Sequence, residues 1–204
     1  MLIAKWLKLD DSEIRNIAKA GLLHDIGKTK IKSEILNKPG PLLPHEYDEV
    51  KKHPELGWKL VSNCPKIHND VCMGILMHHE REDGRGYPNS LKGADIHQFA
   101  SIISIADVFD AMTSNHTYKK SQSPFDVFDY LETEGLTKFN LNVLTIFLQN
   151  ASNCYVGEKF FLNTGELGEI IFIHPKRVSK PIIKIDGTYI DLSRNQNLKV
   201  AKMF

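Results

Sequence analysis

The chain has 204 residues, of which 42% are hydrophobic and 25% are charged. This composition is typical of a globular protein with one main domain, and a chain of this length can bury a large core without disulfide or metal staples. The net charge of +1 excludes a global field that would attract a nucleic-acid polymer or an anionic membrane.

The cysteines and the apolar runs of the sequence indicate which cellular compartment to expect. The three cysteines, Cys64, Cys72 and Cys154, form no CxxC pair and are odd in number, which disfavours a disulfide framework. No apolar run approaches the roughly 18 residues of a membrane-spanning helix, and the first residues lack the apolar core and cleavage site of a signal peptide. We therefore expect a cytoplasmic chain without a membrane segment.

Residues from about 10 to 151 carry helical patterns. The first helix is expected to begin near Asp10, because cap candidates precede apolar residues at helical spacing. Pro44 predicts the first turn of another helix. Further helices are expected within residues 55–64, 67–80, 97–112, 124–135 and 140–151. A loop rich in glycine, proline and charge, residues 81–95, interrupts them. We therefore predict a mainly α domain over residues 1–151.

The pattern changes after about residue 155. Residues 159–193 contain short β-branched and aromatic runs, interrupted by Thr-Gly, Leu-Gly and Asp-Gly pairs that predict hairpin-like turns. We therefore expect a small β-rich appendage over residues 155–204. A packing role for this appendage is favoured over a partner-binding module.

Four of the nine histidines lie at the ends of expected helices. His24 closes an apolar helix and precedes Asp25, His53 lies at a helix junction, and His78 and His79 close another apolar helix. The other five are expected to be surface residues or hydrogen-bonded core residues: His45, His68, His97, His116 and His174.

Asp107 lies in a segment otherwise patterned for burial. Ile102, Ile103, Ala106 and Phe109 form the expected buried stripe, and Asp107 lies beside it. A carboxylate that enters a packed interior costs several kcal/mol unless it is paired or bound to a metal. A specific partner is therefore expected for Asp107.

These six side chains make a nitrogen and oxygen ligand set of four imidazoles and two carboxylates. Adjacent helical residues project about 100° apart, so each adjacent pair can face one site only near a helix end, where both pairs lie. Histidine with carboxylate suits iron, manganese or zinc, and the lack of thiolates disfavours a structural zinc site. A shared carboxylate such as Asp25 could bridge two metals about 3.5–4 Å apart. Separate core hydrogen bonds are the alternative.

Four sequence blocks also occur in a known order. They are HDIGK (24–28), HPELG (53–57), HHEREDGRGYP (78–88) and IADVFDAMTSNHTYKK (105–120). In this order they resemble the HD-GYP family, a branch of the HD superfamily of metal-dependent phosphohydrolases that degrades cyclic di-GMP. The resemblance implies an HD-type helical bundle, and the β-rich appendage looks like a segment that follows this domain in some bacterial members.

The resemblance also implies roles for single residues. Its metal ligands fall on His24, Asp25, His53, His78, His79 and Asp107. Asp25 and Lys28 would act in catalysis. Substrate would contact Lys28, His116, Tyr118 and Lys119. The signature loop would contain Asp83, Gly84, Gly86, Tyr87 and Pro88, for which a plain tight turn is the alternative. Glu80 and Asp110 would either orient ligands or be ordinary helix-surface charges.

The implied reaction is hydrolysis of cyclic di-GMP to pGpG, with a second cut to GMP as a further step. Two divalent ions, or three, would bind phosphate oxygens, with iron or manganese expected ahead of zinc. A metal-activated hydroxide would attack phosphorus in line with the departing ribose oxygen, and Lys28 would offset the charge on the phosphoryl group. Expected partners are the cyclic dinucleotide and a sensor or signalling protein.

Two departures from the family pattern keep alternatives open. Residues 1–23 contain no histidine, whereas family members carry a metal-binding histidine on a helix there, so the chain is either a fragment or a member that lost this ligand. The sequence HTYKK at 116–120 replaces an arginine-containing segment and lacks the bidentate arginine fork. The alternatives are a phosphohydrolase of another nucleotide and a non-catalytic module that binds nucleotide or a protein.

Overall fold

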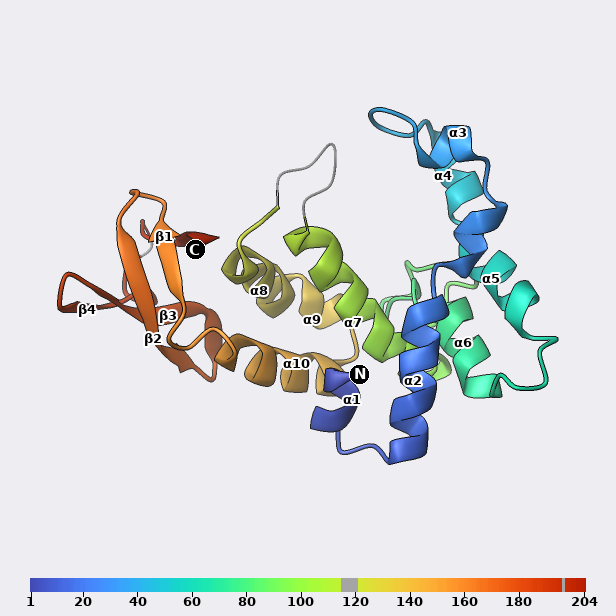
Figure 1. The fold of residues 1–204 in the computed structure, drawn as a ribbon, viewed down its shortest axis with the longest axis horizontal. Helices are drawn as coiled ribbons and strands as arrows, with labels where there is room; N and C mark the ends of the chain where they lie inside the picture. The colour runs from blue at the N-terminus through green and yellow to red at the C-terminus, as the bar shows by residue number, and fades with distance from the viewer. Residues whose placement is uncertain (115–120, 196) are drawn as a thin grey trace. The chain divides into compact units, whose positions relative to one another are not determined.

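A computed structural model describes residues 1–114, 121–195 and 197–204. The described chain is mainly helical up to residue 153 and ends in an antiparallel β-sheet, which confirms the predicted fold class (Figure 1). It divides into two compact units, Met1–Asp107 with Thr137–Val143 and Val108–Leu136 with Leu144–Phe204. The domain boundary expected between residues 151 and 155 stays a prediction.

Short helices build the first unit. They are α1 (Leu2–Trp6), α2 (Asp11–Leu23), α3 (Ser33–Leu36), α4 (Pro44–Val50), α5 (His53–Val61) and α6 (Asn69–Met77), with the 3-10 turns η1 (Ile26–Lys30) and η2 (Gly93–Asp95). Helix α2 starts with a capping box, because the Asp10 carboxylate accepts from the Glu13 amide and Glu13 accepts from the Asp10 amide. Pro44 occupies the first turn of α4, as predicted.

A close contact fixes η1 against α5. A Cβ on Gly27 would lie 1.9 Å from the His53 carbonyl oxygen and 2.5 Å from the Gly57 amide nitrogen, so only glycine fits there. Helix α5 in turn packs against α6, and α6 packs against α2. The ends of these elements therefore meet in one region of the first unit.

Helix α7 (Gln98–Thr113) begins in the first unit and ends in the second. Ile102 and Ile103 are buried, as predicted. Ala106, however, is exposed and Phe109 is only half-buried, so this part of the predicted stripe was wrong. The buried run of α7 ends at Ile105, two residues before the boundary between the units, which side-chain spacing alone does not reveal.

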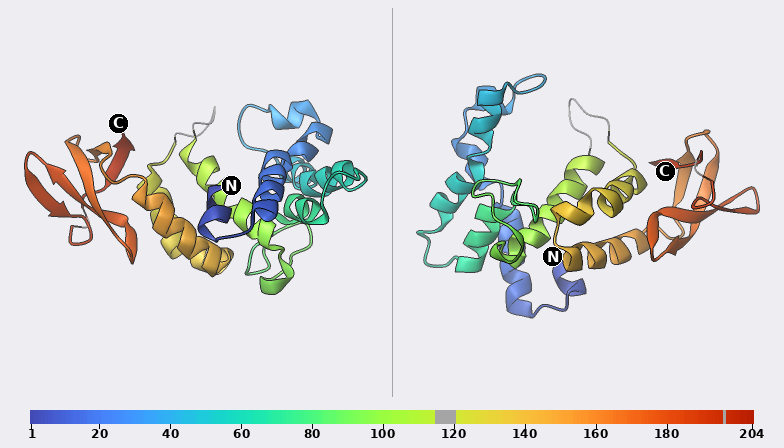
Figure 2. Two further views of the ribbon diagram at one scale, coloured as in Figure 1. Left: turned by 60° about the horizontal axis from the view of Figure 1, so that its bottom comes forward. Right: turned by 180° about the vertical axis from the view of Figure 1, so that it is seen from behind.

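The second unit combines helices with a sheet. Its elements are the end of α7, α8 (Pro124–Thr133), parts of α9 (Gly135–Lys138) and α10 (Leu141–Asn153), β1 (Lys159–Leu162), β2 (Leu167–His174), β3 (Arg177–Ile185), β4 (Thr188–Asp191) and β5 (Val200–Met203). Among the described residues the strand order is β4-β3-β2-β1-β5, with antiparallel pairing throughout. Figure 2 shows β1, β2 and β3 side by side from two further directions.

Two of the three glycine pairs form turns, and one does not. Thr164–Gly165 and Asp186–Gly187 lie between strands, and both glycines have positive φ, as hairpin turns require. Leu167–Gly168, predicted as a turn, lies inside β2 instead. A Cβ on Gly168 would lie 2.8 Å from the ring of Phe160, so this glycine makes room for a buried aromatic side chain.

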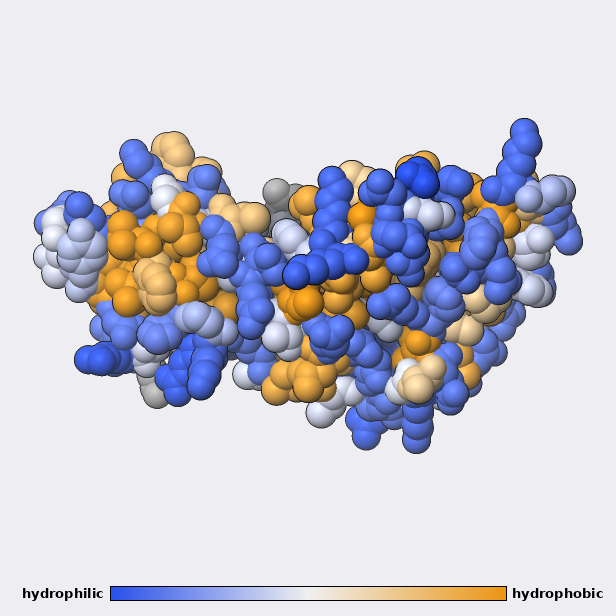
Figure 3. All heavy atoms as spheres, turned by 90° about the horizontal axis from the view of Figure 1, so that it is seen from below, coloured by the Kyte–Doolittle hydropathy of each residue, from blue (hydrophilic) through white to orange (hydrophobic). Residues whose placement is uncertain are grey.

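The surface mixes hydrophilic and hydrophobic residues, as Figure 3 shows for one face. Leu22 and Phe204, each 85% exposed, are among the exposed large hydrophobic side chains. Single exposed side chains of this kind are normal in folded proteins. Among the described residues, no helix has the length and apolar character needed to span a membrane.

Candidate metal centre

The structure brings the six predicted ligands together in the first unit. Four of them lie at helix ends, as the sequence predicts: His24 caps the C-terminus of α2, Asp25 follows it, His53 begins α5, and His78 caps the C-terminus of α6. His79 follows His78 along the chain, and Asp107 lies in α7. Helix α5 packs against η1 and α6, α6 packs against α2, and Asp107 lies 3.7 Å from His24. The six side chains therefore form one cluster, which we call the histidine cluster.

Backbone carbonyls fix three of the imidazoles. The Nδ1 atoms of His24 and His53 each lie 2.8 Å from the carbonyl oxygen three residues earlier, and the Nδ1 of His78 lies 2.7 Å from its own such oxygen. A carbonyl can only accept, so each Nδ1 donates, and the Nε2 of a neutral ring keeps a free lone pair. This arrangement orients Nε2 as a metal ligand.

The Nε2 atoms of His53 and His78 lie 3.2 Å apart. Both rings donate through Nδ1, so in their neutral forms two lone pairs face each other with no proton between them. Metal–nitrogen bonds are about 2.0–2.1 Å long, so two nitrogens roughly 3 Å apart can share one ion. A bound cation would therefore satisfy both nitrogens.

Asp25 lies between two groups of ligand atoms. One carboxylate oxygen, Oδ1, is 3.3 Å from the Nε2 of His53, and the other, Oδ2, is 3.4 Å from the Nε2 of His24. The Nε2 of His24 also lies 3.7 Å from Oδ1 of Asp107. Within the described ranges of the chain, two sets of three residues bring their ligand atoms within 4.8 Å of one another: His53, His78 and His79, and His24, Asp25 and His78.

Burial keeps the inner imidazoles neutral. His53 is 1% exposed and His78 is 0% exposed. Burial lowers the pKa of His53, and it lowers the pKa of His78 to about 3 and that of His79 to about 2. These rings are therefore unprotonated near neutral pH, which is the form that binds metal.

Two groups of the cluster favour their charged forms. Burial opposes charge on both, but the contact between His24 and Asp107 outweighs it. It raises the pKa of His24, and together with the other histidines it lowers the pKa of Asp107 to about 2. Asp107 is therefore a carboxylate near neutral pH, and the predicted partner for it is present.

Lys28 adds a positive charge beside the carboxylate of Asp25. Its Nζ lies 2.6 Å from Asp25 Oδ2, and both side chains are partly exposed. Lys28 lies in the 3-10 turn η1, three residues after Asp25, so the turn places the two side chains on the same side of the backbone. The lysine ammonium is thus next to the ligand set and open to solvent.

The signature loop is fastened to the end of α6. The Glu80 carboxylate, 2% exposed, accepts hydrogen bonds from the Asn89 amide at 2.7 Å and the Leu91 amide at 3.0 Å. A Cβ on Gly86 would lie 2.4 Å from the Glu80 Cα, so this glycine allows the close approach. The surface-charge alternative for Glu80 is therefore wrong: its carboxylate organises the loop.

Tyr87 places an aromatic ring over the cluster. Its ring stacks on His79 with centroids 4.6 Å apart, and its amide donates to the His79 carbonyl at 3.3 Å. The Tyr87–Pro88 peptide bond is cis. In the same loop, Asp83 accepts from the Arg85 amide at 3.0 Å, and Gly84 has positive φ. The loop is a constrained turn that also contacts the histidine cluster.

Other predicted residues lie outside this geometry. His116, Tyr118 and Lys119, predicted to contact substrate, are outside the described residues. Asp110 is exposed and accepts a hydrogen bond from the Ser114 hydroxyl at 3.1 Å, which agrees with the surface alternative. Four of the five histidines assigned other roles are described: His45, His68 and His174 are exposed, and His97 is half-buried.

A sequence model of the HD domain family matches residues 2–143, which include the whole histidine cluster. The chain belongs to the HD domain family. The family resemblance read from the four sequence blocks is thereby confirmed. HD domains bind divalent metal, and the convergent imidazoles of this chain could hold such an ion.

Two curated relatives and one solved structure extend this assignment. The chain is 34% identical to a cyclic di-GMP phosphodiesterase of Pseudomonas aeruginosa, over 90% of this chain and 44% of that protein. It is 35% identical to a 3'3'-cGAMP-specific phosphodiesterase of Vibrio cholerae, over 72% of this chain and 28% of that protein. The chain therefore spans less than half the length of these HD relatives.

The solved structure is the HDG"Y"P protein of Bdellovibrio bacteriovorus. It superposes with a TM-score of 0.58 at 23% sequence identity, covering 71% of this chain and 46% of that one. At this level of identity the likeness supports the fold.

Proposed function

We propose that this HD domain is a metal-dependent phosphodiesterase that hydrolyses cyclic di-GMP to pGpG. The observation that carries the proposal is the convergence of four imidazoles and two carboxylates, with the Lys28 ammonium 2.6 Å from one of them. The relative in Pseudomonas aeruginosa named as a cyclic di-GMP phosphodiesterase supports the choice of substrate.

Two divalent ions, iron or manganese, are the proposed cofactors. His53, His78 and His79 would hold one ion, and His24 and Asp107 would hold the other. Asp25 would be shared, because its two carboxylate oxygens face different histidines. Histidine and carboxylate ligands without thiolates suit these metals. When bound, the ions supply positive charge to the phosphodiester and lower the pKa of water.

The side chains of this chain then bind and orient the substrate. Lys28 would contact a phosphate oxygen and offset the negative charge that gathers as the phosphorus–oxygen bond to the ribose breaks. Hydrolysis adds one water: its oxygen bonds to phosphorus, and its proton ends on the departing 3' oxygen. Tyr87, stacked on His79, would restrict access of bulk water to the cluster. His116, Tyr118 and Lys119 are proposed to contact the rest of the dinucleotide.

A direct test uses purified chain loaded with manganese or iron. It is incubated with cyclic di-GMP, 3'3'-cGAMP and bis(p-nitrophenyl) phosphate, and products are separated by chromatography. We expect pGpG from cyclic di-GMP, and no product after treatment with a chelator. The 3'3'-cGAMP arm is needed because the Vibrio cholerae relative is named as specific for that dinucleotide.

Two histidine variants complete the test. His53→Gln removes a buried ligand, and His45→Gln changes an exposed histidine outside the cluster. We expect His53→Gln to lose bound metal and activity, and His45→Gln to keep both. Cleavage of 3'3'-cGAMP alone would replace the proposed substrate. Bound metal without cleavage of any of the three substrates would overturn the enzymatic proposal.

A further inference from the structure

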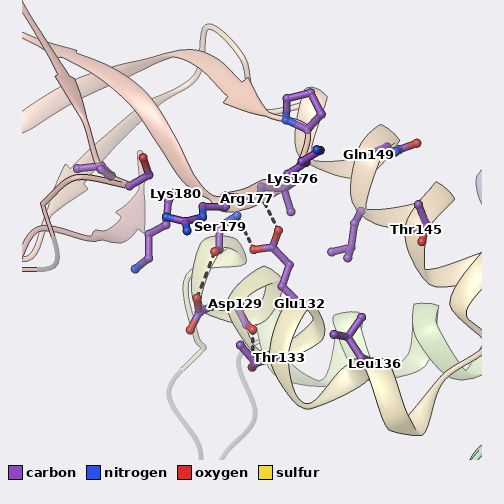
Figure 4. A pocket seen from close by; sticks show the side chains of 15 residues that line it. Asp129, Glu132, Thr133, Leu136, Thr145, Gln149, Lys176, Arg177, Ser179 and Lys180 are labelled. Carbon is purple, nitrogen blue, oxygen red and sulfur yellow. Dashed lines mark hydrogen bonds between the residues drawn. The ribbon is translucent and has the colours of Figure 1, made fainter.

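The second unit contains a cavity that involves none of the histidine cluster residues. It has a volume of about 700 Å³ and is lined by residues of α8, α9, α10 and β3, of the turn that precedes β3 and of the segment that follows β4 (Figure 4). Ligand pockets commonly have volumes of about 300–1,000 Å³. Leu136, Leu148 and Leu192 give it an apolar part, and Lys176, Arg177 and Lys180 give it a basic part. The cavity thus has the size and the mixed lining of a small-molecule site.

The carboxylates of this cavity are already engaged. Glu132 accepts from the Val178 amide at 2.7 Å and from the Ser179 amide at 3.1 Å, and Asp129 accepts from the Ser179 hydroxyl at 3.2 Å. Figure 4 shows both carboxylates on α8 directed at β3. They fasten the strand to the helix, which is a structural role.

The three cations of the cavity have no such partners. Within the part of the chain that the structure describes, Lys176, Arg177 and Lys180 take part in no ion pair or side-chain hydrogen bond. Arg177 and Lys180 lie on β3, and Lys176 lies in the turn before it. Glu132 already accepts from two backbone amides of this strand, and Asp129 already accepts from the Ser179 hydroxyl. Three cations against two engaged carboxylates leave a local excess of positive charge for an anionic ligand.

A second, smaller cavity adds an independent observation. It has a volume of about 230 Å³ and shares Gln149, Pro175 and Val178 with the larger one. Ser152 lines it, is 0% exposed, and has a hydroxyl without a hydrogen-bond partner among the described residues. A buried polar atom without a partner costs free energy, so a polar atom in this cavity, from water or from a ligand, would satisfy the Ser152 hydroxyl.

We propose that the two adjoining cavities, which share Gln149, Pro175 and Val178, together bind a small aliphatic organic anion, either a carboxylate or a phosphate monoester. Its anionic group lies at Lys176, Arg177 and Lys180, its chain lies over the leucines, and a polar group at its far end reaches Ser152. None of the residues that line the two cavities is aromatic, so there is no ring on which a nucleobase could stack. This site is independent of the proposed phosphodiesterase activity.

Binding is measured on the whole chain by calorimetry and by amide shifts in nuclear magnetic resonance spectra. The probes are hexanoate, hexyl phosphate, 6-hydroxyhexanoate, inorganic phosphate and hexyltrimethylammonium. We expect one saturable site in which the better of hexanoate and hexyl phosphate binds at least about tenfold tighter than inorganic phosphate. The ammonium probe should not bind. The order of hexanoate and hexyl phosphate then identifies the anionic group.

Matched variants locate the site. Lys176→Gln/Arg177→Gln should weaken anion binding at least about tenfold, whereas Lys159→Gln/Lys202→Gln, which changes two exposed cations on other strands, should not. Ser152→Ala should keep or raise the melting temperature, because it removes an unpartnered hydroxyl, and should abolish any advantage of 6-hydroxyhexanoate over hexanoate.

Three results would overturn the site. They are the absence of saturable binding by either anion, equal losses in the two double variants, and binding of the ammonium probe as tight as that of the anions.

Discussion

Backbone carbonyls orient three imidazole rings of the histidine cluster without any bound ligand. At His24, His53 and His78 the Nδ1 atom meets the carbonyl oxygen three residues earlier, at 2.7 to 2.8 Å. Each of these histidines stands at a helix boundary, where that carbonyl is adjacent to the ring. The Nε2 atoms are thereby directed into the histidine cluster, which reduces the ordering cost of binding cations there.

Substitution of Lys28 tests whether its positive charge stabilises the transition state of the proposed hydrolysis. Lys28→Gln removes the positive charge 2.6 Å from Asp25 while leaving the ligand set intact. Loss of one charge-stabilising donor should lower kcat about 100-fold, with bound metal unchanged. Steady-state rates and metal analysis measure the two quantities. Lys30→Gln, an exposed lysine in the same turn, should behave as wild type; an equal loss in both variants would argue against a specific role.

Substitution of Gly27 tests whether the close contact between η1 and α5 is needed for stability. Gly27→Ala places a Cβ 1.9 Å from the His53 carbonyl oxygen, which is backbone and cannot easily move. Overpacking of this kind should lower the free energy of unfolding by about 3 kcal/mol. Gly21→Ala is the matched control, because Gly21 lies in helix α2 with nothing within 4 Å of a new Cβ. It should raise stability by about 0.5–1 kcal/mol in urea unfolding. Equal stability of the two variants would contradict the packing described.

At the scale of elements, the end of α6 and the signature loop form one unit through Glu80. Its two carboxylate oxygens each accept one backbone amide, from residues 9 and 11 positions later in the chain. Tyr87, between these anchors and Glu80, then stacks on His79. The loop is therefore a positioning device for an imidazole of the cluster.

Glu80 variants should loosen this loop in steps. Glu80→Gln keeps one accepting oxygen but turns an NH2 group toward the other amide, which should cost about 1–3 kcal/mol of stability. Glu80→Ala leaves two buried amides unpaired and should cost more. Thermal unfolding and limited proteolysis within residues 81–95 measure the effect. Asp95 is an exposed carboxylate in the same loop, so Asp95→Asn should change neither the melting temperature nor the proteolysis. Equal effects of Asp95→Asn and Glu80→Gln would contradict the anchoring of the loop by Glu80.

At the scale of the whole molecule, bound metal should couple to folding. The buried imidazoles of His53 and His78 have facing lone pairs, which destabilises the metal-free chain. A ligand present at 100 times its Kd raises the free energy of unfolding by about 2.7 kcal/mol. Chelation should therefore lower the melting temperature, and added manganese should restore it. His53→Gln should abolish this metal response, while His45→Gln should keep it. A melting temperature indifferent to metal in the wild-type chain would contradict the coupling.

Much of the fold and the cluster follows from local sequence pattern, and the remainder depends on contacts that are distant along the chain. Apolar runs that end in His24 or His78 predict both the helix boundaries and polar groups held there. The Leu-Gly pair predicts a turn at Gly168, but this glycine makes room for Phe160 on a neighbouring strand, a contact that local pattern does not contain. The sequence does not predict the burial of Glu80, because its partners are backbone amides of a loop, whose conformation has no periodic pattern.

The cavity of the second unit was not predictable for the same reason. Its lining comes from α8, α10 and β3, and Ser152 reads as an ordinary helix residue until those elements pack around it. Lys176, Arg177 and Lys180 likewise read as scattered surface charges. Three-dimensional packing alone shows that they share one space.

Anomalous scattering from crystals of the chain grown with manganese tests directly whether the histidine cluster holds metal ions. The proposed two-ion site predicts two peaks within the histidine cluster, one beside the facing Nε2 atoms of His53 and His78 and one beside His24 and Asp107, with the Asp25 carboxylate near both. Crystals with full manganese exposure and no anomalous peak at these side chains would contradict it.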